Sequence, residues 1–162
     1  MTAVRPALLV LEDGSVYEGR CVARGTRFGE VVFNTAMSGY QEVLTDPSYR
    51  GQIVVMTQPH IGNYGMNRAS AESGRIWVEG FIARQFTAEP SNFDSESGLV
   101  AELQTSGVPA LDGIDTRALV RKLRDRGALR GVITSERSDV AALLAEVREF
   151  PVMTGRALVD EV

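Results

Sequence analysis

Two runs of strand-forming residues flank the dipeptide Asp13-Gly14 near the start of the chain, and few arrangements other than a hairpin accommodate them. The apolar run 7–11 precedes the dipeptide and residues 15–22 follow it. A two-residue hairpin turn needs positive φ angles, which glycine adopts without steric cost. The chain is therefore predicted to begin with an antiparallel β-hairpin that turns at Asp13 and Gly14.

Further strands are predicted after the hairpin, each as a short apolar stretch bounded by turn residues. They cover residues 30–33, 52–57 and 76–83. Residues 59–73 are rich in Gly, Asn and Ser and predict an ordered loop. Strands therefore dominate the first two-thirds of the predicted fold.

The last third of the chain alternates helices with short strands. Asp115 is predicted to cap a helix that ends at Gly127, and Ser138 or Asp139 to cap another. A further helix is predicted over 94–104, and extended pieces over 108–111 and 131–134. The apolar face of the helix from Asp115 is expected to comprise Ala118, Leu119, Val120 and Leu123. Strands first and helices later predict a layered α/β domain.

Charge and composition narrow the class of function. The 162 residues carry 17 Lys and Arg against 21 Asp and Glu, a net charge of −4, which argues against a duplex DNA binder. No apolar run reaches the roughly 18 residues of a membrane span. Glu12 and Asp13 end the short N-terminal apolar stretch, so no secretory signal is expected. We expect a cytoplasmic protein.

The single thiol, Cys21, and the single imidazole, His60, are the candidates for nucleophilic chemistry. A Cys–His hydrolase is one hypothesis, since the two need only meet in space. However, Cys21 lies inside a predicted strand, where nothing local stabilises a thiolate. His60 lies in a predicted loop, where a lone histidine more often anchors the backbone, and a metal site needs several ligands. Neither a catalytic residue nor a metal site is predicted.

Two segments leave their interpretation open. Cations on the predicted helix after Asp115 form either a solvated face or an anchoring surface for an acidic partner. The segment 34–49 mixes small polar residues with tyrosines, and Pro47 restricts the backbone beside Ser48. It is either a ligand-binding loop or a tight structural connection. The helix cations are Arg117, Arg121, Lys122, Arg124 and Arg126.

Ordered motifs along the chain resemble one known family. They are LEDG at 11–14, GEVVFNT at 29–35, MSGYQE at 37–42, LTDPSY at 44–49, PHIGN at 59–63 and IDTR at 114–117. With these motifs the chain resembles the small, glutamine-using subunit of carbamoyl phosphate synthetase over nearly its whole length.

The resemblance implies a three-layer β/β/α domain of the swivelling type. Residues 1–150 would be the N-terminal domain of the small subunit, and 151–162 a tail leading to the interdomain linker. The family's glutaminase domain, with its G-x-C-x-G-x-Q nucleophile elbow, is absent from this sequence. The resemblance therefore implies a non-catalytic domain, inactive by itself, of a heteromeric ligase and glutamine amidotransferase.

The resemblance also implies partners and one site residue. The whole enzyme makes carbamoyl phosphate from glutamine, bicarbonate and ATP, for arginine and pyrimidine synthesis. The large subunit is the expected docking partner and holds the ATP and metal ions, so no cofactor is expected in this chain. Ser48 occupies the position of a serine that helps bind L-glutamine. A free-standing binding or adaptor module of the same fold is the alternative; no nucleic acid or membrane partner is expected.

Overall fold

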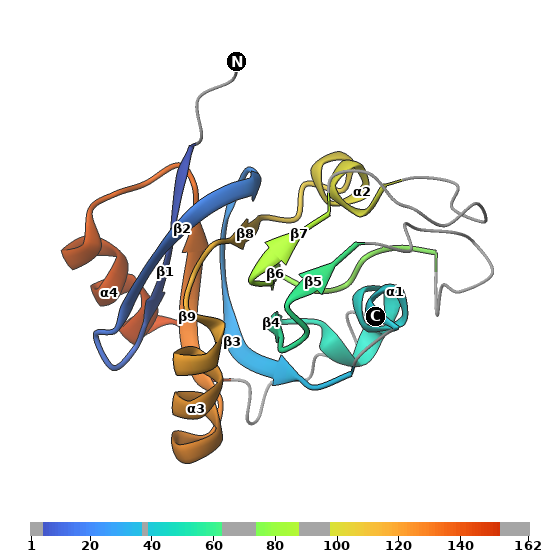
Figure 1. Ribbon diagram of the computed structural model, residues 1–162. Helices are drawn as coiled ribbons and strands as arrows, with labels where there is room; N and C mark the ends of the chain where they lie inside the picture. The colour runs from blue at the N-terminus through green and yellow to red at the C-terminus, as the bar shows by residue number, and fades with distance from the viewer. Residues whose placement is uncertain (1–4, 37–38, 63–73, 88–97, 153–162) are drawn as a thin grey trace.

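Seven strands in one sheet organise the fold of the computed structural model, which describes residues 5–36, 39–62, 74–87 and 98–152 (Figure 1). The ring follows the order β1-β2-β8-β6-β4-β3-β9 and closes as a barrel. Its strands are β1 (Pro6–Leu11), β2 (Val16–Ala23), β3 (Thr26–Asn34), β4 (Gln52–Met56), β6 (Gly80–Ile82), β8 (Ala110–Asp112) and β9 (Leu129–Thr134). A separate pair, β5 (His60–Ile61) and β7 (Gln85–Phe86), runs parallel.

The barrel combines two kinds of pairing. β3, β4, β6 and β8 run parallel to their neighbours in this group, as crossover connections require. β1, β2 and β9 pair antiparallel with the strands beside them. The mixed α/β class predicted from the sequence is confirmed, while the three-layer swivelling arrangement stays a prediction.

Successive residues of a barrel strand point to opposite sides of the sheet, and both sides are buried in apolar cores. This explains the unbroken apolar runs of the sequence. One core takes buried residues from six of the seven barrel strands and fills the interior, with Leu9, Val31 and Ile53 among its members, while partly buried residues of β2 pack against it. The neighbouring residues point outward: Val54 joins a second core under helices, and Val10 a third.

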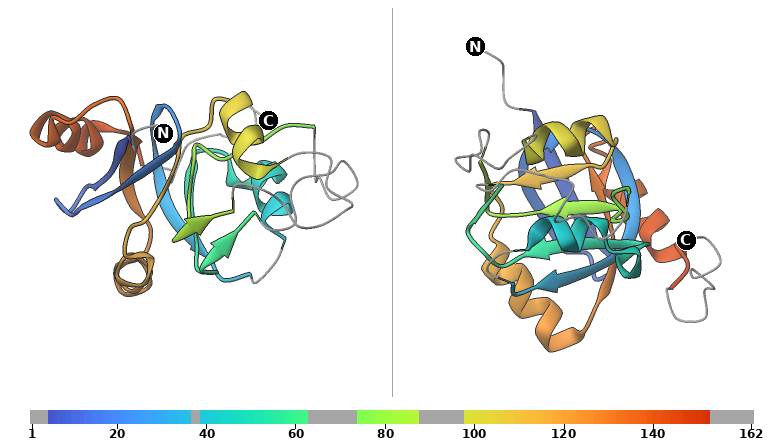
Figure 2. Two further views of the ribbon diagram at one scale, coloured as in Figure 1. Left: turned by 45° about the horizontal axis from the view of Figure 1, so that its top comes forward. Right: turned by 90° about the vertical axis from the view of Figure 1, so that its right-hand side faces the viewer.

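Within the described residues, four α-helices cover the barrel: α1 (Tyr40–Thr45), α2 (Leu99–Thr105), α3 (Thr116–Arg126) and α4 (Val140–Glu149). α1 and α2 pack on the second core at one end of the molecule, and α4 packs on β1 and β9 at the other (Figures 1 and 2). α3 packs against β3 and β4 and adds Leu119 and Leu123 to the interior core.

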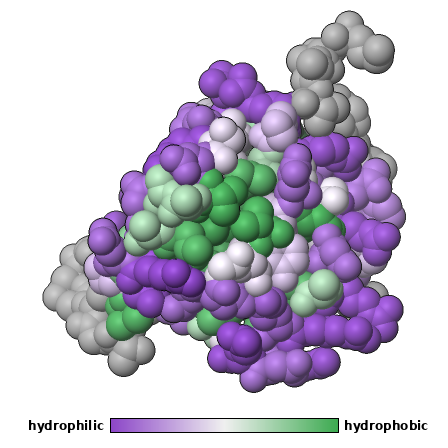
Figure 3. Space-filling view, turned by 90° about the vertical axis from the view of Figure 1, so that its left-hand side faces the viewer, coloured by the Kyte–Doolittle hydropathy of each residue, from purple (hydrophilic) through white to green (hydrophobic). Residues whose placement is uncertain are grey.

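The face over β1, β2 and α4 carries an apolar centre within a polar rim (Figure 3). Beneath it lies the small core of α4, in which Leu143 and Val147 are fully buried. Leu8, Phe28 and Leu144 pack around that core and stay partly accessible.

Several predicted elements are confirmed. The hairpin itself is confirmed, but its turn is longer than the two residues predicted. Residues 12–15 connect β1 to β2, the Gly14 N–H donates to the Leu11 carbonyl at 2.9 Å, and within the turn only Gly14 has a positive φ, 91°. Asp115 caps α3 by accepting a hydrogen bond from the Ala118 N–H, and Gly127 ends that helix at φ 83°. Asp139 caps α4.

Other predictions need correction. Only Gly80–Ile82 of the predicted strand 76–83 is a strand, because the Trp77 N–H instead donates to the Leu44 carbonyl in α1. His60 lies in β5 rather than in a loop. Ala118 is exposed on α3, whereas Thr116 is buried. Residues 63–73 of the predicted loop, 94–97 of the predicted helix and 153–162 of the predicted tail lie outside the described residues.

Candidate functional site

The crossover between the parallel strands β3 and β4 holds Ser48, the residue singled out by the sequence motifs. It contains α1 and a 3-10 turn, η1 (Pro47–Tyr49). Proline fits the first position of such a turn because its fixed φ suits it and its missing N–H costs nothing there. The Asp46 carboxylate caps the turn by accepting from the Ser48 N–H at 2.9 Å. The local sequence DPSY therefore specifies the turn.

The backbone of Ser48 is fixed while its side chain faces solvent. The Tyr49 N–H donates to the Asp46 carbonyl and the Arg50 N–H to the Pro47 carbonyl, each at 3.1 Å. Ser48 is exposed, and its hydroxyl makes no hydrogen bond to another described residue. A hydroxyl can both donate and accept, so Ser48 presents one oriented polar group on a rigid turn.

Side chains on either side of the turn hold it against the barrel. The Asn34 side chain, at the end of β3, donates to the Tyr49 hydroxyl at 3.0 Å. The guanidinium carbons of Arg75 and Arg50 lie 4.2 and 5.8 Å from the ring centroid of Trp77. Cation–π contacts at such distances stabilise exposed sites by about 0.5–1 kcal/mol each. Trp77 therefore helps to fix the crossover, a role that its sequence context did not indicate.

The structure does not bring Cys21 and His60 together. Cys21 lies on β2, is a partly buried free thiol and packs against the interior core. His60 is exposed on β5, outside the barrel. The hypothesis of a Cys–His nucleophilic pair is therefore not supported by their placement. Among the described residues, no three His, Cys, Asp or Glu side chains are grouped so that they could hold a metal ion.

The cations of α3 divide into two groups. Lys122 faces the first hairpin, where its ammonium donates to Asp13 Oδ2 at 2.7 Å and to the Ser15 hydroxyl at 2.5 Å. Burial raises the pKa of Asp13, but hydrogen bonds from Lys122 and Ser15 outweigh that effect and lower it to about 2. Arg117, Arg121, Arg124 and Arg126 stay exposed.

A second internal ion pair joins Glu12, after β1, to Arg130 on β9. The Arg130 guanidinium donates to Glu12 Oε2 at 2.7 Å and to the Phe150 carbonyl at 2.8 Å. The hydrogen bonds from Arg130 lower the pKa of Glu12. The pair ties β1 and β9 to the end of α4, and no sequence pattern indicated it.

The fold and these surfaces together define a class: a mixed α/β barrel domain that presents a rigid serine turn on one crossover and an arginine-bearing helix elsewhere. Comparison with known proteins identifies the family within this class. A family model described as carbamoyl-phosphate synthase small chain, CPSase domain, matches residues 9–133. The chain belongs to this family, and the assignment made from the sequence motifs is confirmed.

Curated relatives carry the same description. The carbamoyl phosphate synthase small chain of Streptomyces coelicolor is 53% identical over 160 residues, which cover 97% of this chain and 42% of that protein. Its namesake in Chlorobaculum tepidum is 52% identical over 158 residues, covering 97% of this chain and 43% of the relative. The namesake in Nostoc is 54% identical over 158 residues, covering 97% and 41%. The chain thus spans about two-fifths of the length of these relatives.

No helix among the described residues is both long and apolar enough to cross a membrane.

Proposed function

We propose that this chain serves as the non-catalytic domain of the small subunit in a glutamine-hydrolysing carbamoyl phosphate synthetase. The main support is that the chain belongs to the small-chain family and is about half identical to curated relatives over nearly its whole length. In this proposal the domain docks on the large subunit and lends one wall to the glutamine pocket. Its three-layer swivelling architecture and its division into residues 1–150 and a linker tail belong to the same proposal.

The chemistry is divided among the parts of the proposed enzyme. A separate glutaminase domain of the small subunit releases ammonia from glutamine, and the large subunit holds the ATP and metal ions. This chain contributes no cofactor and acts in the cytoplasm, in a heteromer whose product feeds arginine and pyrimidine synthesis. Isolated, it hydrolyses no glutamine.

Ser48 is the residue through which the domain would touch glutamine. Its hydroxyl is exposed, has no described partner and is carried by a capped turn, so it can bind the amino-acid end of a substrate without first reorganising. A substrate group held in this way keeps its amide near a nucleophile supplied by the glutaminase domain. Ser48 acts by binding, not by bond breaking.

Docking is tested by mixing the purified chain with the large subunit and separating the mixture by size-exclusion chromatography. We expect co-elution at concentrations at which the intact small subunit also co-elutes. Separate elution of the two under those conditions would favour the free-standing adaptor instead. Glutaminase activity in the isolated chain, abolished by Cys21→Ser, would contradict the assignment of a non-catalytic role.

The role of Ser48 is tested in the full-length small subunit bound to the large subunit. Ser48→Ala removes one hydrogen bond, and we expect KM for glutamine to rise about 5- to 10-fold, as loss of about 1 kcal/mol implies. Ammonia-dependent synthesis should be unchanged. Ser106→Ala, at an exposed serine that ends α2, is the matched control. An unchanged KM for glutamine in Ser48→Ala would contradict the role.

A further inference from the structure

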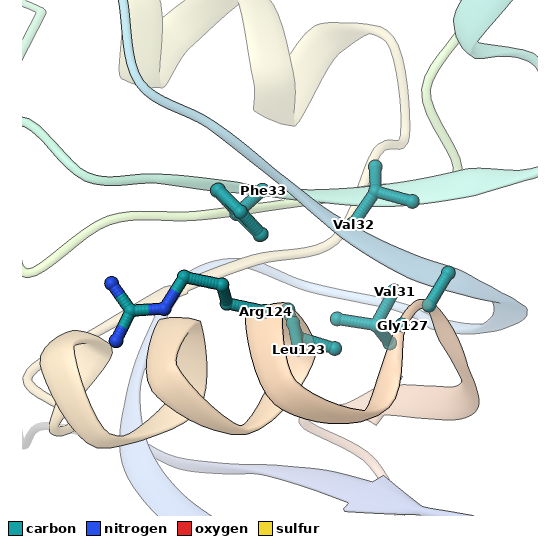
Figure 4. A pocket seen from close by; sticks show the side chains of 7 residues that line it. Val31, Val32, Phe33, Leu123, Arg124 and Gly127 are labelled. Atoms are coloured by element: carbon teal, nitrogen blue, oxygen red, sulfur yellow. The ribbon is translucent and has the colours of Figure 1, made fainter.

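Two adjoining hollows run along α3, and Arg124 lines both. The first, of about 310 Å³, is mainly apolar and lies between β3 and the end of α3 (Figure 4). Figure 4 shows Val32 and Phe33 on the strand above Leu123 and Arg124 on the helix. The second, of about 410 Å³, is bordered by four arginines: Arg84, Arg117, Arg121 and Arg124. We call the first the apolar hollow and the second the arginine hollow.

The arginine hollow concentrates positive charge in a chain whose net charge is −4. Arg117, Arg121 and Arg124 follow one another at helical spacing, so their Cα atoms span about 10 Å along α3. Arg84, between β6 and β7, faces them from another part of the fold. Thr57 and Thr116 add hydroxyl groups, which can donate to an acidic ligand.

Three of these four guanidinium groups lack an acidic partner in the part of the chain that the structure describes. Arg84, Arg117 and Arg121 form no ion pair there. Arg124 lies only near its neighbour Asp125, at 4.0 Å, in a pair whose side chains are 67% and 75% exposed. An ion pair so exposed contributes little stability. By contrast, Lys122 on the same helix is already paired with Asp13.

The exposure of these arginines and the apolar hollow beside them favour a protein segment over a small anion as the ligand. A site for a small anion holds its donors partly buried and pre-ordered, whereas these four arginines are exposed side chains. Arginine beside an apolar pocket is typical of the centre of protein interfaces, where it is buried when the partner binds. The two hollows share Arg124, so one extended segment can occupy both.

We propose that this surface of α3 docks an acidic segment of the large subunit, which places an apolar side chain in the apolar hollow and carboxylates against Arg117, Arg121 and Arg84. The inference rests on the proposed function and names the docking surface that it leaves open. Carboxylates fit because each guanidinium offers two parallel N–H donors in a fork that matches their geometry.

The test uses the full-length small subunit and measures its affinity for the large subunit by titration. The double variant Arg117→Glu/Arg121→Glu should weaken binding at least 30-fold, about 2 kcal/mol, since reversing charges opposite carboxylates adds repulsion to the lost attraction. Arg126→Glu changes an exposed arginine of the same helix that borders neither hollow, and should change affinity less than about 3-fold. Raising the salt concentration should weaken binding of the wild type more than binding of the double variant.

A second variant separates shape from charge. Ala128 is exposed and borders the apolar hollow, so Ala128→Arg fills the hollow while adding positive charge. If an apolar side chain of the large subunit occupies the hollow, Ala128→Arg weakens binding despite the extra charge. If only charge matters, Ala128→Arg strengthens binding, which would contradict the proposed apolar contact. Thermal unfolding of each variant alone verifies that it is folded.

The outcomes distinguish the two proposals. A wild-type small subunit that does not bind the large subunit overturns the proposed function and this inference with it. A wild type that binds, beside a folded double variant that binds equally well, leaves the proposed function standing and overturns the docking surface. Loss of affinity in the double variant alone, with Arg126→Glu unaffected, supports the surface.

Discussion

The Lys122 side chain links helix α3 to the first hairpin. It is the one cation of α3 that turns toward the first hairpin, and it reaches Asp13 and Ser15 across more than a hundred residues of sequence. The side chains of Lys122 and Asp13 are only 28% and 12% exposed, so solvent screens their attraction weakly. The contact anchors the hairpin turn to the helix.

Replacing Lys122 with methionine should destabilise the domain in a pH-dependent way. The pKa of Asp13 falls from 3.8 to about 2 in the folded state, so its ionised form stabilises the fold above pH 3.8. That contribution is lost as the pH falls through about 2. We expect Lys122→Met to cost about 1–2 kcal/mol at neutral pH, and the gap to the wild type to narrow as the pH falls from about 4 to 2.

Urea unfolding at several pH values measures this gap. Arg126→Met, at an exposed position of the same helix, is the control and should cost well under 1 kcal/mol. A gap that stays constant between neutral and acid pH would show that the lysine acts through packing alone.

Sequence reasoning at this scale succeeded where the partner is local. Asp115 and its N–H partner at Ala118 are three residues apart, so the cap could be predicted from spacing. Lys122 was one of five helix cations with no local distinction, because its partner comes from the other end of the chain. Arg84 had no pattern around it at all, and only the fold places it opposite α3.

Among the elements, the barrel strands leave the least room for an added side chain. Gly80 opens β6, and a Cβ atom there would lie 2.8 Å from Ile133 Cγ2 and 3.3 Å from Ile53 Cγ2. Both isoleucines belong to the interior core. Glycine at this position therefore lets β6 lie close to the side chains that fill the barrel.

Gly80→Ala should overpack the barrel and destabilise it by about 1–3 kcal/mol. Gly74→Ala is the matched control, because a Cβ atom there meets nothing within 4 Å; it should change stability by less than about 0.5 kcal/mol. The free energy of unfolding in urea checks both. Equal stability of the two variants would mean that the core relaxes to accept the extra methyl group.

Turn chemistry made some elements predictable and left others hidden. The hairpin at Gly14 and the turn at Pro47 follow from residues that are adjacent in sequence. The strand predicted over 76–83 was too long, because periodicity cannot reveal that the Trp77 backbone bonds to α1 and its ring lies by two arginines. Composition likewise could not predict that the Ser48 side chain is exposed, and only the family motif singled out Ser48.

In the whole molecule, the serine turn and the docking surface lie on opposite faces of the same strands. The crossover with α1 packs on the outer core through Tyr40 and Leu44, whereas α3 packs on the interior core through Leu119 and Leu123. Figure 1 shows α1 and α3 separated by the barrel strands. We therefore expect changes at one face to leave the other face intact.

This separation predicts independent effects on binding of the large subunit and on binding of glutamine. Arg117→Glu/Arg121→Glu should weaken binding of the large subunit while KM for glutamine of the small subunit alone changes less than about 2-fold. Ser48→Ala should do the reverse. Titration of the two subunits and glutaminase kinetics of the small subunit supply the two measurements, and a triple variant should combine both effects without coupling. Strong coupling would mean that the barrel transmits strain between its faces.

The position of β9 has a consequence for biosynthesis. This strand is the last of the ring in chain order, yet it sits between β1 and β3 and pairs with both. A nascent chain that has not yet reached residue 129 has an unpaired edge on each of those strands, and such edges invite pairing with other chains. The domain therefore cannot complete its sheet before β9 is synthesised, and the edges of β1 and β3 stay unpaired until β9 emerges from the ribosome.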